Sequence, residues 1–479
     1  MTDRTDHPDI RTLGELRAAR VAHRTLREEI RENLLRTLAE GGDPWPGLHG
    51  LGRTVLPQLE RALLAGHDVV LLGERGQGKT RLLRTLAGLL DEWSPAIEGS
   101  ELNEHPLEPL TEASRRRILL EGDELPVVWR HRSERYVEKL ATPDTSVADL
   151  IGDVDPMRVA EGRRLGDPET IHYGLVPRSH RGIVAINELP DLAERIQVAM
   201  LNVMEERDIQ IRGYVLRLPL DVLVVATANP EDYTNRGRII TPLKDRFGAE
   251  IRTHYPLELE DEIAVIRQEA ELIAEVPDTI LETLARFTRL LRESSAVDQR
   301  SGVSARFAIA GAETVAAAAL RRATIRGETE AVARMVDMET ATDVLAGKIE
   351  FESGEEGRER AILDHLLRRA TAETVRGRFR GIDLGPVVEA FDGRTTVSTG
   401  DDVSAQDFLA GLPELAAPDD LSAPDDGDDR AGTTYDEIAA RLGATTPGQR
   451  ASAIELALEG LYLAQKISKD ADEGGTVYG

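Results

Sequence analysis

The sequence contains no cysteine, only 4% aromatic residues, and far fewer basic than acidic side chains. Without cysteine there can be no disulfide, no cysteine-ligated zinc and no thiol catalysis, and the chain suits a reducing compartment, so we expect a cytoplasmic protein. The net charge of −27 opposes tight, sequence-independent binding of nucleic acid, which needs clustered Lys and Arg. No apolar run reaches the roughly 18 residues that span a bilayer, so we expect no membrane span.

The stretch from Val69 to Leu90 carries the strongest chemical signal. Its first four residues are apolar and predict a buried strand, and leucines at helical spacing after Thr80 predict a helix. Between them lies G-x-x-x-x-G-K-T, whose glycines let backbone N–H groups surround a phosphate at a helix N-terminus. We expect Lys79 to reach the β- and γ-phosphates of ATP, and the Thr80 hydroxyl to bind Mg²⁺. The predicted nucleotide-binding residues are Gly73, Glu74, Arg75, Gly76, Gln77, Gly78, Lys79 and Thr80.

A second signal is the apolar stretch 183–186, which predicts a strand ending in Asn187 and Glu188. A carboxylate at a strand end beside a phosphate loop can polarise the water that attacks the γ-phosphate, so Glu188 is the predicted catalytic base. Asn187 stands where an Asp usually holds a Mg²⁺-bound water; it keeps an acceptor oxygen but lacks the charge. We therefore expect Asn187 to contact the metal of Mg–ATP through water, with weaker affinity or slower turnover. On this interpretation Asn187→Asp leaves hydrolysis equal or faster.

Further elements follow in order along the chain. Residues 209–218 alternate around Arg212 and predict a β-hairpin, and 222–227 predict another buried strand, followed by Asn229. An amide at that strand end can orient the attacking water. Beyond Leu257 the pattern is helical. The predicted helices span 277–294, 304–326, 328–346, 358–375, 435–442 and 447–467, and residues 11–40 predict one long amphipathic helix.

The order of these motifs resembles an AAA+ ATPase, and more closely the branch that holds the magnesium-chelatase ATPase subunits and the MoxR proteins. The resemblance covers roughly residues 47–326. It is carried by GERGQGKT (73–80), ATPDTSVADLIGDVD (141–155), YGLVPRSHRGIVAINELPDL (173–192), ATANPEDY (226–233), PLKDRFG (242–248) and GVSAR (302–306).

The resemblance implies roles for three further side chains. Asn229 matches the first sensor residue, Arg246 matches the arginine finger that enters a neighbouring subunit's ATP site, and Arg306 matches the second-sensor arginine of the lid. A finger supplied by another subunit implies a ring, expected to be a hexamer. The family also implies a partner with a von Willebrand A domain; because this chain has no D-x-S-x-S motif, we expect that partner to be a separate protein.

The fold class that follows is α/β: a P-loop AAA+ parallel sheet flanked by helices, then an all-α lid and a small helical C-terminal region. Between Gly400 and Arg430 there are ten acidic residues and one basic residue, which predicts a disordered tether. The expected domains are an N-terminal helical segment (1–46), the AAA+ nucleotide-binding domain (47–256), the lid and its extension (257–400), an acidic disordered linker (401–432) and a C-terminal helical segment (433–479).

Three functions stay open at this point. The favoured one is an ATP-hydrolysing ring that remodels a protein client as a chaperone or inserts a metal, with magnesium chelation as a narrower case. A nucleic-acid motor or transcriptional regulator is the second: the GAFTGA loop of such regulators is absent, but Arg212 and Arg217 leave a DNA contact open. The third is a slow, ATP-gated assembly switch, which a turnover assay would separate from the first.

Overall fold

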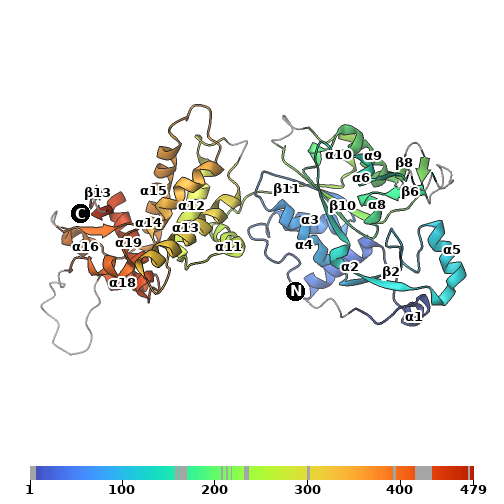
Figure 1. The fold of residues 1–479 in the computed structure, drawn as a ribbon, viewed down its shortest axis with the longest axis horizontal. Coiled ribbons are helices and arrows are strands. Elements are labelled where there is room, and N and C mark those ends of the chain that lie inside the picture. Colours follow the sequence, from blue (N-terminus) through green and yellow to red (C-terminus); the bar gives the residue numbers. More distant parts are fainter. Residues whose placement is uncertain are drawn as a thin grey trace. The chain divides into compact units, whose positions relative to one another are not determined.

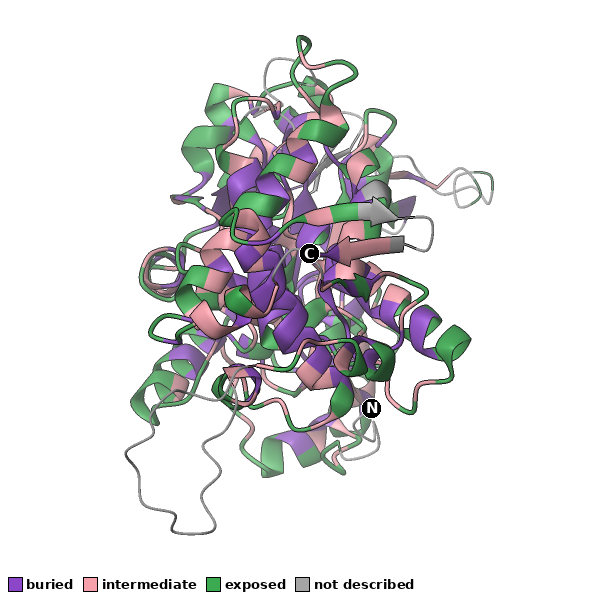
Figure 2. Ribbon diagram, turned by 90° about the vertical axis from the view of Figure 1, so that its left-hand side faces the viewer, coloured by how far each residue is buried: buried purple, intermediate pink, exposed green. Residues whose placement is uncertain are grey.

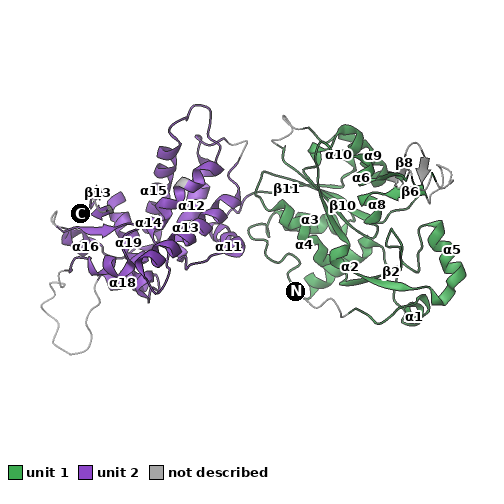
Figure 3. Cartoon of the chain, in the orientation of Figure 1, with its two compact units in different colours: residues 1–254 green, residues 255–479 purple. Residues whose placement is uncertain are grey.

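The computed structural model forms two compact units, residues 1–254 (unit 1) and 255–479 (unit 2), coloured separately in Figure 3. The residues it describes are 7–155, 157, 160, 170–206, 209–211, 214–216, 218–230, 237–298, 302–391, 395–415, 434–472 and 475–479. Within these ranges no helix is long and apolar enough to cross a membrane. Each unit is described by itself below.

A parallel sheet organises unit 1, and its described strands lie in the order β11-β1-β10-β7-β4. Two of these strands, β10 and β11, are labelled in Figure 1. All four neighbouring pairs are parallel. The strand before the phosphate loop, β1, thus lies between two strands that come later in the chain. This is the AAA+ strand order, so the predicted fold class is confirmed for this unit. The strands are β1 (Val69–Leu72), β4 (Tyr136–Leu140), β7 (Gly182–Asn187), β10 (Val222–Ala228) and β11 (Ala249–Arg252).

Both faces of this sheet are covered, which explains why β1, β7 and β10 read as unbroken apolar runs rather than as alternating ones. One face packs its buried side chains against α2, α3 and α4. The other packs against α6, α8, α9 and α10. Buried residues are purple in Figure 2. The covering helices are α2 (Leu26–Ala39), α3 (Val55–Leu64), α4 (Lys79–Thr85), α6 (Val147–Leu150), α8 (Leu175–Arg178), α9 (Glu194–Glu206) and α10 (Thr241–Arg246).

The remaining described elements of unit 1 are short and lie between these. The hairpin predicted over residues 209–218 is confirmed as the antiparallel pair β8–β9, although Arg212 and Arg217 lie outside the described residues. The polar region after α4 holds a second antiparallel pair, β2–β3. These elements are α1 (Leu13–Ala18), η1 (Leu86–Leu89), β2 (Trp93–Ile97), α5 (Glu112–Glu121), η2 (Gly122–Glu124), β3 (Val127–His131), η3 (Arg132–Glu134), β5 (Gly152–Val154), β6 (Ile171–Tyr173), η5 (Leu189–Asp191), β8 (Ile209–Ile211) and β9 (Tyr214–Leu216).

The long helix predicted over residues 11–40 is wrong, because the structure divides it into α1 and α2. Arg20 has a left-handed backbone (φ 52°), which ends the first helix. Thr25 then starts the second one with a capping box, in which its hydroxyl accepts from the Glu28 N–H and the Glu28 carboxylate accepts from the Thr25 N–H. The T-x-x-E spacing at residues 12–15 and 25–28 is the sequence signal for two starts rather than one.

Unit 2 is helical, as predicted, around one continuous hydrophobic core that runs from α11 to the last strand. The C-terminal segment is part of this core: α19 is buried along most of its length. A three-stranded antiparallel sheet, β12-β14-β13, was not predicted. The elements are α11 (Leu259–Glu269), α12 (Asp278–Glu293), α13 (Ala305–Arg326), α14 (Met335–Leu345), η7 (Ala346–Lys348), α15 (Glu359–Arg378), α16 (Gly385–Ala390), β12 (Val397–Thr399), α17 (Ala405–Ala410), α18 (Thr434–Arg441), α19 (Pro447–Leu463), β13 (Lys469–Asp472) and β14 (Gly475–Tyr478).

The prediction of disorder from residue 401 onward is wrong for α17, which lies inside the acidic stretch. Ser404 caps this helix by accepting from the Asp407 N–H, and Phe408 is buried in the core of unit 2. One aromatic anchor and a cap are enough to order a short helix that average composition marks as polar. Residues 416–433 of the predicted linker lie outside the described residues.

Candidate functional site

The phosphate-binding loop lies between β1 and α4, in the strand–loop–helix context that the sequence predicts. Gly78 is the N-cap of α4 and has a left-handed backbone (φ 75°), which glycine adopts without strain. Gly73 is needed for a different reason. A Cβ there would lie 2.0 Å from the Thr253 Oγ1 and 2.2 Å from the Gln77 Oε1, so no larger residue fits unless these groups move.

Polar contacts hold the loop against the ends of β1 and β11. The Gln77 Oε1 accepts from the Glu74 N–H at 3.1 Å and from the Thr253 hydroxyl at 2.8 Å. The ammonium of Lys79 donates to the carbonyls of Gly73 (2.5 Å) and Glu74 (2.6 Å), and its side chain is largely buried. Lys79 is therefore fixed within the loop, with its charge at the N-terminus of α4.

The predicted polar residues at the other strand ends share this edge of the sheet. Leu72 pairs with Ala228, and Ala226 pairs with Ile186, so the carboxyl ends of β1, β10 and β7 are level. Glu188 directly follows β7 and Asn229 directly follows β10. The structure thus brings Glu188, Asn229 and the loop to one edge, where ligands bind in open parallel sheets.

The backbone of Glu188 is left-handed (φ 55°). A residue other than glycine pays about 1–3 kcal/mol for such a conformation, and it persists where the surroundings fix it. One fixing contact is the Glu188 N–H, which donates to the Thr227 hydroxyl at 3.1 Å. This strained residue is the predicted catalytic base.

Asn187 is held by two hydrogen bonds of opposite direction. Its Nδ2 donates to the Glu138 Oε1 at 2.7 Å, and its Oδ1 accepts from the Thr227 hydroxyl at 3.2 Å. Asn187 is only 7% exposed. Its amide is thus engaged with protein groups on both sides. The prediction that Asn187→Asp leaves hydrolysis equal or faster did not consider Glu138, whose carboxylate would face the new one.

Glu138 lies on β4, next to β7, and is itself anchored. Arg84 of α4 binds it with two N–H groups, Nε to Oε2 at 2.8 Å and Nη2 to Oε1 at 3.2 Å. The Tyr136 hydroxyl donates to the same carboxylate at 3.3 Å. The Arg84 hydrogen bonds hold the pKa of Glu138 below its ordinary value, so this group is a carboxylate near neutral pH.

The two arginines carried over from the family resemblance lie at exposed positions. Arg246 ends α10, and its side chain, 40% exposed, forms an ion pair with Glu205 of α9 at 2.5 Å. Arg306 is exposed in the first turn of α13, whose N-cap is Ser304. It belongs to unit 2 and is described with that unit, so its predicted role at the nucleotide stays a prediction.

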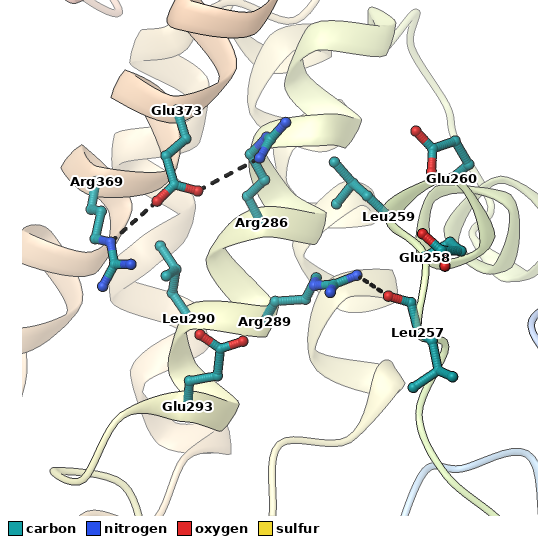
Figure 4. Close-up of a pocket in the computed structure, with 10 residues that line it drawn as sticks. All are labelled: Leu257, Glu258, Leu259, Glu260, Arg286, Arg289, Leu290, Glu293, Arg369 and Glu373. Atoms are coloured by element: carbon teal, nitrogen blue, oxygen red, sulfur yellow. Dashed lines mark hydrogen bonds and ion pairs between the residues drawn. The ribbon is translucent and has the colours of Figure 1, made fainter.

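Unit 2 contains a hollow of about 460 Å³ (Figure 4). Its arginines are already engaged: Glu373 pairs with Arg286 and Arg369, and Arg289 donates to the Leu257 carbonyl. Four acidic and three basic side chains line the hollow, and all of its lining residues belong to unit 2. Among the described residues no group of three or more His, Asp or Glu side chains is arranged to hold a metal ion.

Sequence reasoning missed Glu138, Arg84 and Thr227. Glu138 is 49 residues from Asn187 in the chain and meets it only because β4 and β7 are neighbours. The sequence signal for Glu138 was Asn187 itself. An amide has an NH₂ group that a carboxylate lacks, so an amide at this position indicates a hydrogen-bond acceptor next to it.

Comparison with known proteins relates the chain to one family at a distance, although no protein-family model matches it. It is 28% identical over 222 residues to the magnesium-chelatase subunit ChlI of Guillardia theta, covering 45% of this chain and 58% of that protein. It is also 28% identical over 242 residues to the magnesium-chelatase 38 kDa subunit of Acidiphilium rubrum, covering 50% and 63%. The chain is a distant homologue of these subunits and spans less than two thirds of their length.

Solved structures resemble the chain only weakly. The BchI–BchD complex of magnesium chelatase gives a TM-score of 0.36 at 22% identity, covering 65% of this chain and 97% of the matched chain. A RuvB variant of Thermotoga maritima gives 0.35 at 14% identity, covering 88% and 90%. The assignment of the fold rests on the strand order and register described above.

Proposed function

We propose, from the premise that the chain is a distant homologue of the magnesium-chelatase subunits, that it is an AAA+ ATPase that binds and hydrolyses ATP. The observation that carries the proposal is the shared carboxyl edge of β1, β10 and β7. It brings the phosphate loop, Asn229 and Glu188 together, which are the groups that phosphoryl transfer to water needs.

The loop supplies the phosphate contacts. Lys79 would exchange the carbonyls of Gly73 and Glu74 for phosphate oxygens, and charge-assisted hydrogen bonds are roughly twice as strong as those to neutral acceptors. The N-terminus of α4 adds the positive end of a helix dipole, which favours a bound anion at the same place.

The residues present also fit Mg²⁺, which prefers oxygen ligands and keeps several of its waters. Thr80 offers a hydroxyl in the first turn of α4, and the Asn187 Oδ1 retains a second lone pair beside its bond from Thr227. When bound, Mg²⁺ neutralises charge on the β- and γ-phosphate oxygens. Thr80 and Asn187 are the residues we assign to it.

Glu188 is the group we assign to polarise the attacking water, and Asn229 the one that orients it. Both directly follow strands that end level with β1, which places them at the same end of the sheet as the phosphate loop. Glu188 owes its position to a left-handed backbone turn, which directs the chain away from the strand direction directly after Asn187.

Arg246 is assigned to the ATP site of a neighbouring copy in a ring, which we take to be a hexamer. Its place at the end of α10 and its 40% exposure support contact with another chain. Arginine supplied in this way is worth roughly 10³–10⁵ in rate in P-loop enzymes. Arg306 is assigned to the γ-phosphate as the lid residue.

The work that hydrolysis drives is assigned from the family resemblance. We propose remodelling of a protein client, or insertion of a metal, together with a separate partner that bears a von Willebrand A domain. Magnesium chelation is a narrower form of this proposal. We favour the broader form, because the chain matches only part of the magnesium-chelatase subunits.

Subunit mixing tests both the site and the ring. Lys79→Ala, Glu188→Gln and Arg246→Ala should each lose Mg–ATP hydrolysis, whereas the control Arg117→Ala, which removes a half-buried arginine paired with Glu121, should keep it. Mixing Arg246→Ala with Glu188→Gln subunits should restore part of the activity, because some interfaces regain both groups. Inactive mixtures would reject the shared site, and full activity of Lys79→Ala would reject the phosphate loop.

A further inference from the structure

Three side chains from neighbouring strands form one hydrogen-bonded row across the carboxyl edge of the sheet: Glu138 on β4, Asn187 on β7 and Thr227 on β10. We propose that Glu138 is a positioning residue for the ATPase site, because its carboxylate dictates an amide at position 187 and, through Asn187 and Thr227, holds the backbone of Glu188. The effect on catalysis rests on the proposed function, whereas the hydrogen bond between Glu138 and Asn187 does not depend on it.

The direction of every link in the row is determined. The Glu138 carboxylate can only accept, so the group of Asn187 facing it at 2.7 Å must be the NH₂. The Asn187 Oδ1 then faces Thr227, whose single hydroxyl hydrogen is used at 3.2 Å. With its hydrogen spent, the Thr227 oxygen is free to accept the Glu188 N–H at 3.1 Å.

The start of the row is fixed from outside it. Arg84 donates hydrogen bonds to both carboxylate oxygens of Glu138. Because Arg84 lies on α4, five residues after Lys79, these bonds connect the row to the helix that begins at the phosphate loop. Arg84 and Tyr136 are the charged and titratable groups that contact Glu138, and both favour its ionised form or donate to it.

A carboxylate at position 187 would break this order. It would lie about 2.7 Å from the Glu138 carboxylate, at a residue only 7% exposed, and two carboxylates sharing such a site cannot both ionise freely. Either a proton is taken up or the side chains separate, and separation releases Thr227 and the Glu188 N–H. The amide at this position is therefore explained by its neighbour.

An alternative role for Glu138 is a plain ion pair with Arg84 that affects only stability. The two roles differ in their coupling to position 187. If Glu138 acts only through Arg84, then Glu138→Gln cannot improve an Asn187→Asp protein; if it acts through Asn187, it must.

The test is a double-mutant cycle on the full-length protein at pH 8, measuring kcat and KM for Mg–ATP and the thermal midpoint. Asn187→Asp should lower kcat by about tenfold with little change in KM, because two like charges then face each other, and should also lower the midpoint. Adding Glu138→Gln, whose NH₂ can donate to the new carboxylate, should return both quantities close to wild type.

Glu121→Gln is the matched control, since Glu121 also accepts two N–H groups from an arginine, Arg117, in the same unit, and its kcat should stay at the wild-type value. Asn187→Asp as active and as stable as wild type at pH 8 would overturn the inference, as would a double variant no better than Asn187→Asp alone. If wild type releases no phosphate, the proposed function fails, while the midpoints of the four proteins still decide whether Glu138 and Asn187 are paired.

Discussion

Replacing Thr227 by valine removes a single hydroxyl and keeps the branched shape of the side chain. Thr227 is 2% exposed, so water cannot take the place of that hydroxyl. Two hydrogen bonds are lost, the one from the Glu188 N–H at 3.1 Å and the one to the Asn187 Oδ1 at 3.2 Å. Each buried hydrogen bond lost in this way costs about 1–3 kcal/mol, so for the two bonds together we expect a loss of about 2–6 kcal/mol in the free energy of unfolding.

This loss should be visible as a fall in the thermal midpoint of roughly 4–24 °C, since 1 kcal/mol shifts a unit of this size by about 2–4 °C. The left-handed backbone of Glu188 also loses one of its fixing contacts, so kcat for Mg–ATP should fall at least about tenfold while nucleotide affinity changes little. The assay is a thermal melt with and without nucleotide, followed by steady-state phosphate release.

Thr227→Ser is the control, because serine keeps the hydroxyl and loses only a methyl group. It should retain most of the activity and lose only about 1 kcal/mol. A Thr227→Val protein that melts and turns over like wild type would refute the view that this hydroxyl holds Glu188.

Three further predictions follow from contacts elsewhere. Gly73→Ala should weaken ATP binding in a filter or fluorescence assay, because its Cβ would displace the Thr253 and Gln77 groups that hold the loop; unchanged affinity would contradict this. Arg334→Leu should destabilise unit 2 by about 3–5 kcal/mol in denaturant unfolding, since it leaves the buried carboxylate of Glu455 without its 2.8 Å partner; a smaller loss than that of Arg117→Ala would contradict it. Burial lowers the pKa of His105 to about 2 and of His180 to about 3, and each Nδ1 accepts a backbone N–H, so both are neutral when folded. Because the unfolded chain binds these protons below about pH 6.5, stability should fall from pH 7 to pH 5, and the double variant His105→Gln, His180→Gln should flatten that slope in thermal melts.

Local patterns were sufficient wherever a few adjacent residues determine the structure. The phosphate loop, the strands before it and before Glu188, and the hairpin at residues 209–218 all follow from short-range apolar periodicity and turn residues. The helix predicted over 304–326 matches α13 at both ends, since Ser304 caps its start and Gly327, with a left-handed backbone, ends it.

What the sequence could not predict depends on residues that meet only in the fold. Glu138 and Asn187 are 49 residues apart, and Arg334 and Glu455 are 121 apart, so neither pair leaves a local trace. The division of the N-terminal region into α1 and α2 could have been predicted, because both T-x-x-E capping boxes are present in the sequence. The amphipathic pattern that runs across both helices led to the prediction of one helix instead.

The C-terminal part illustrates the limit of composition. The acidic stretch whose composition predicts a disordered linker contains the helix α17. This helix is ordered because Phe408 is buried in a core formed by helices distant in the sequence. The last strand, β14, pairs with β12 some 80 residues earlier, and Tyr478 donates to the buried Glu459 at 2.7 Å, which joins the chain end to that core.

The central claim, that Glu188 activates water at an ATP site formed by the β1–α4 loop, is tested most directly by comparing wild type with Glu188→Gln. Both full-length proteins are given Mg–ATP, and bound nucleotide and released phosphate are measured on the same samples. The account predicts that wild type releases phosphate, whereas Glu188→Gln retains bound ATP and releases almost none. Equal phosphate release by the two proteins, or no ATP binding by either, would contradict it.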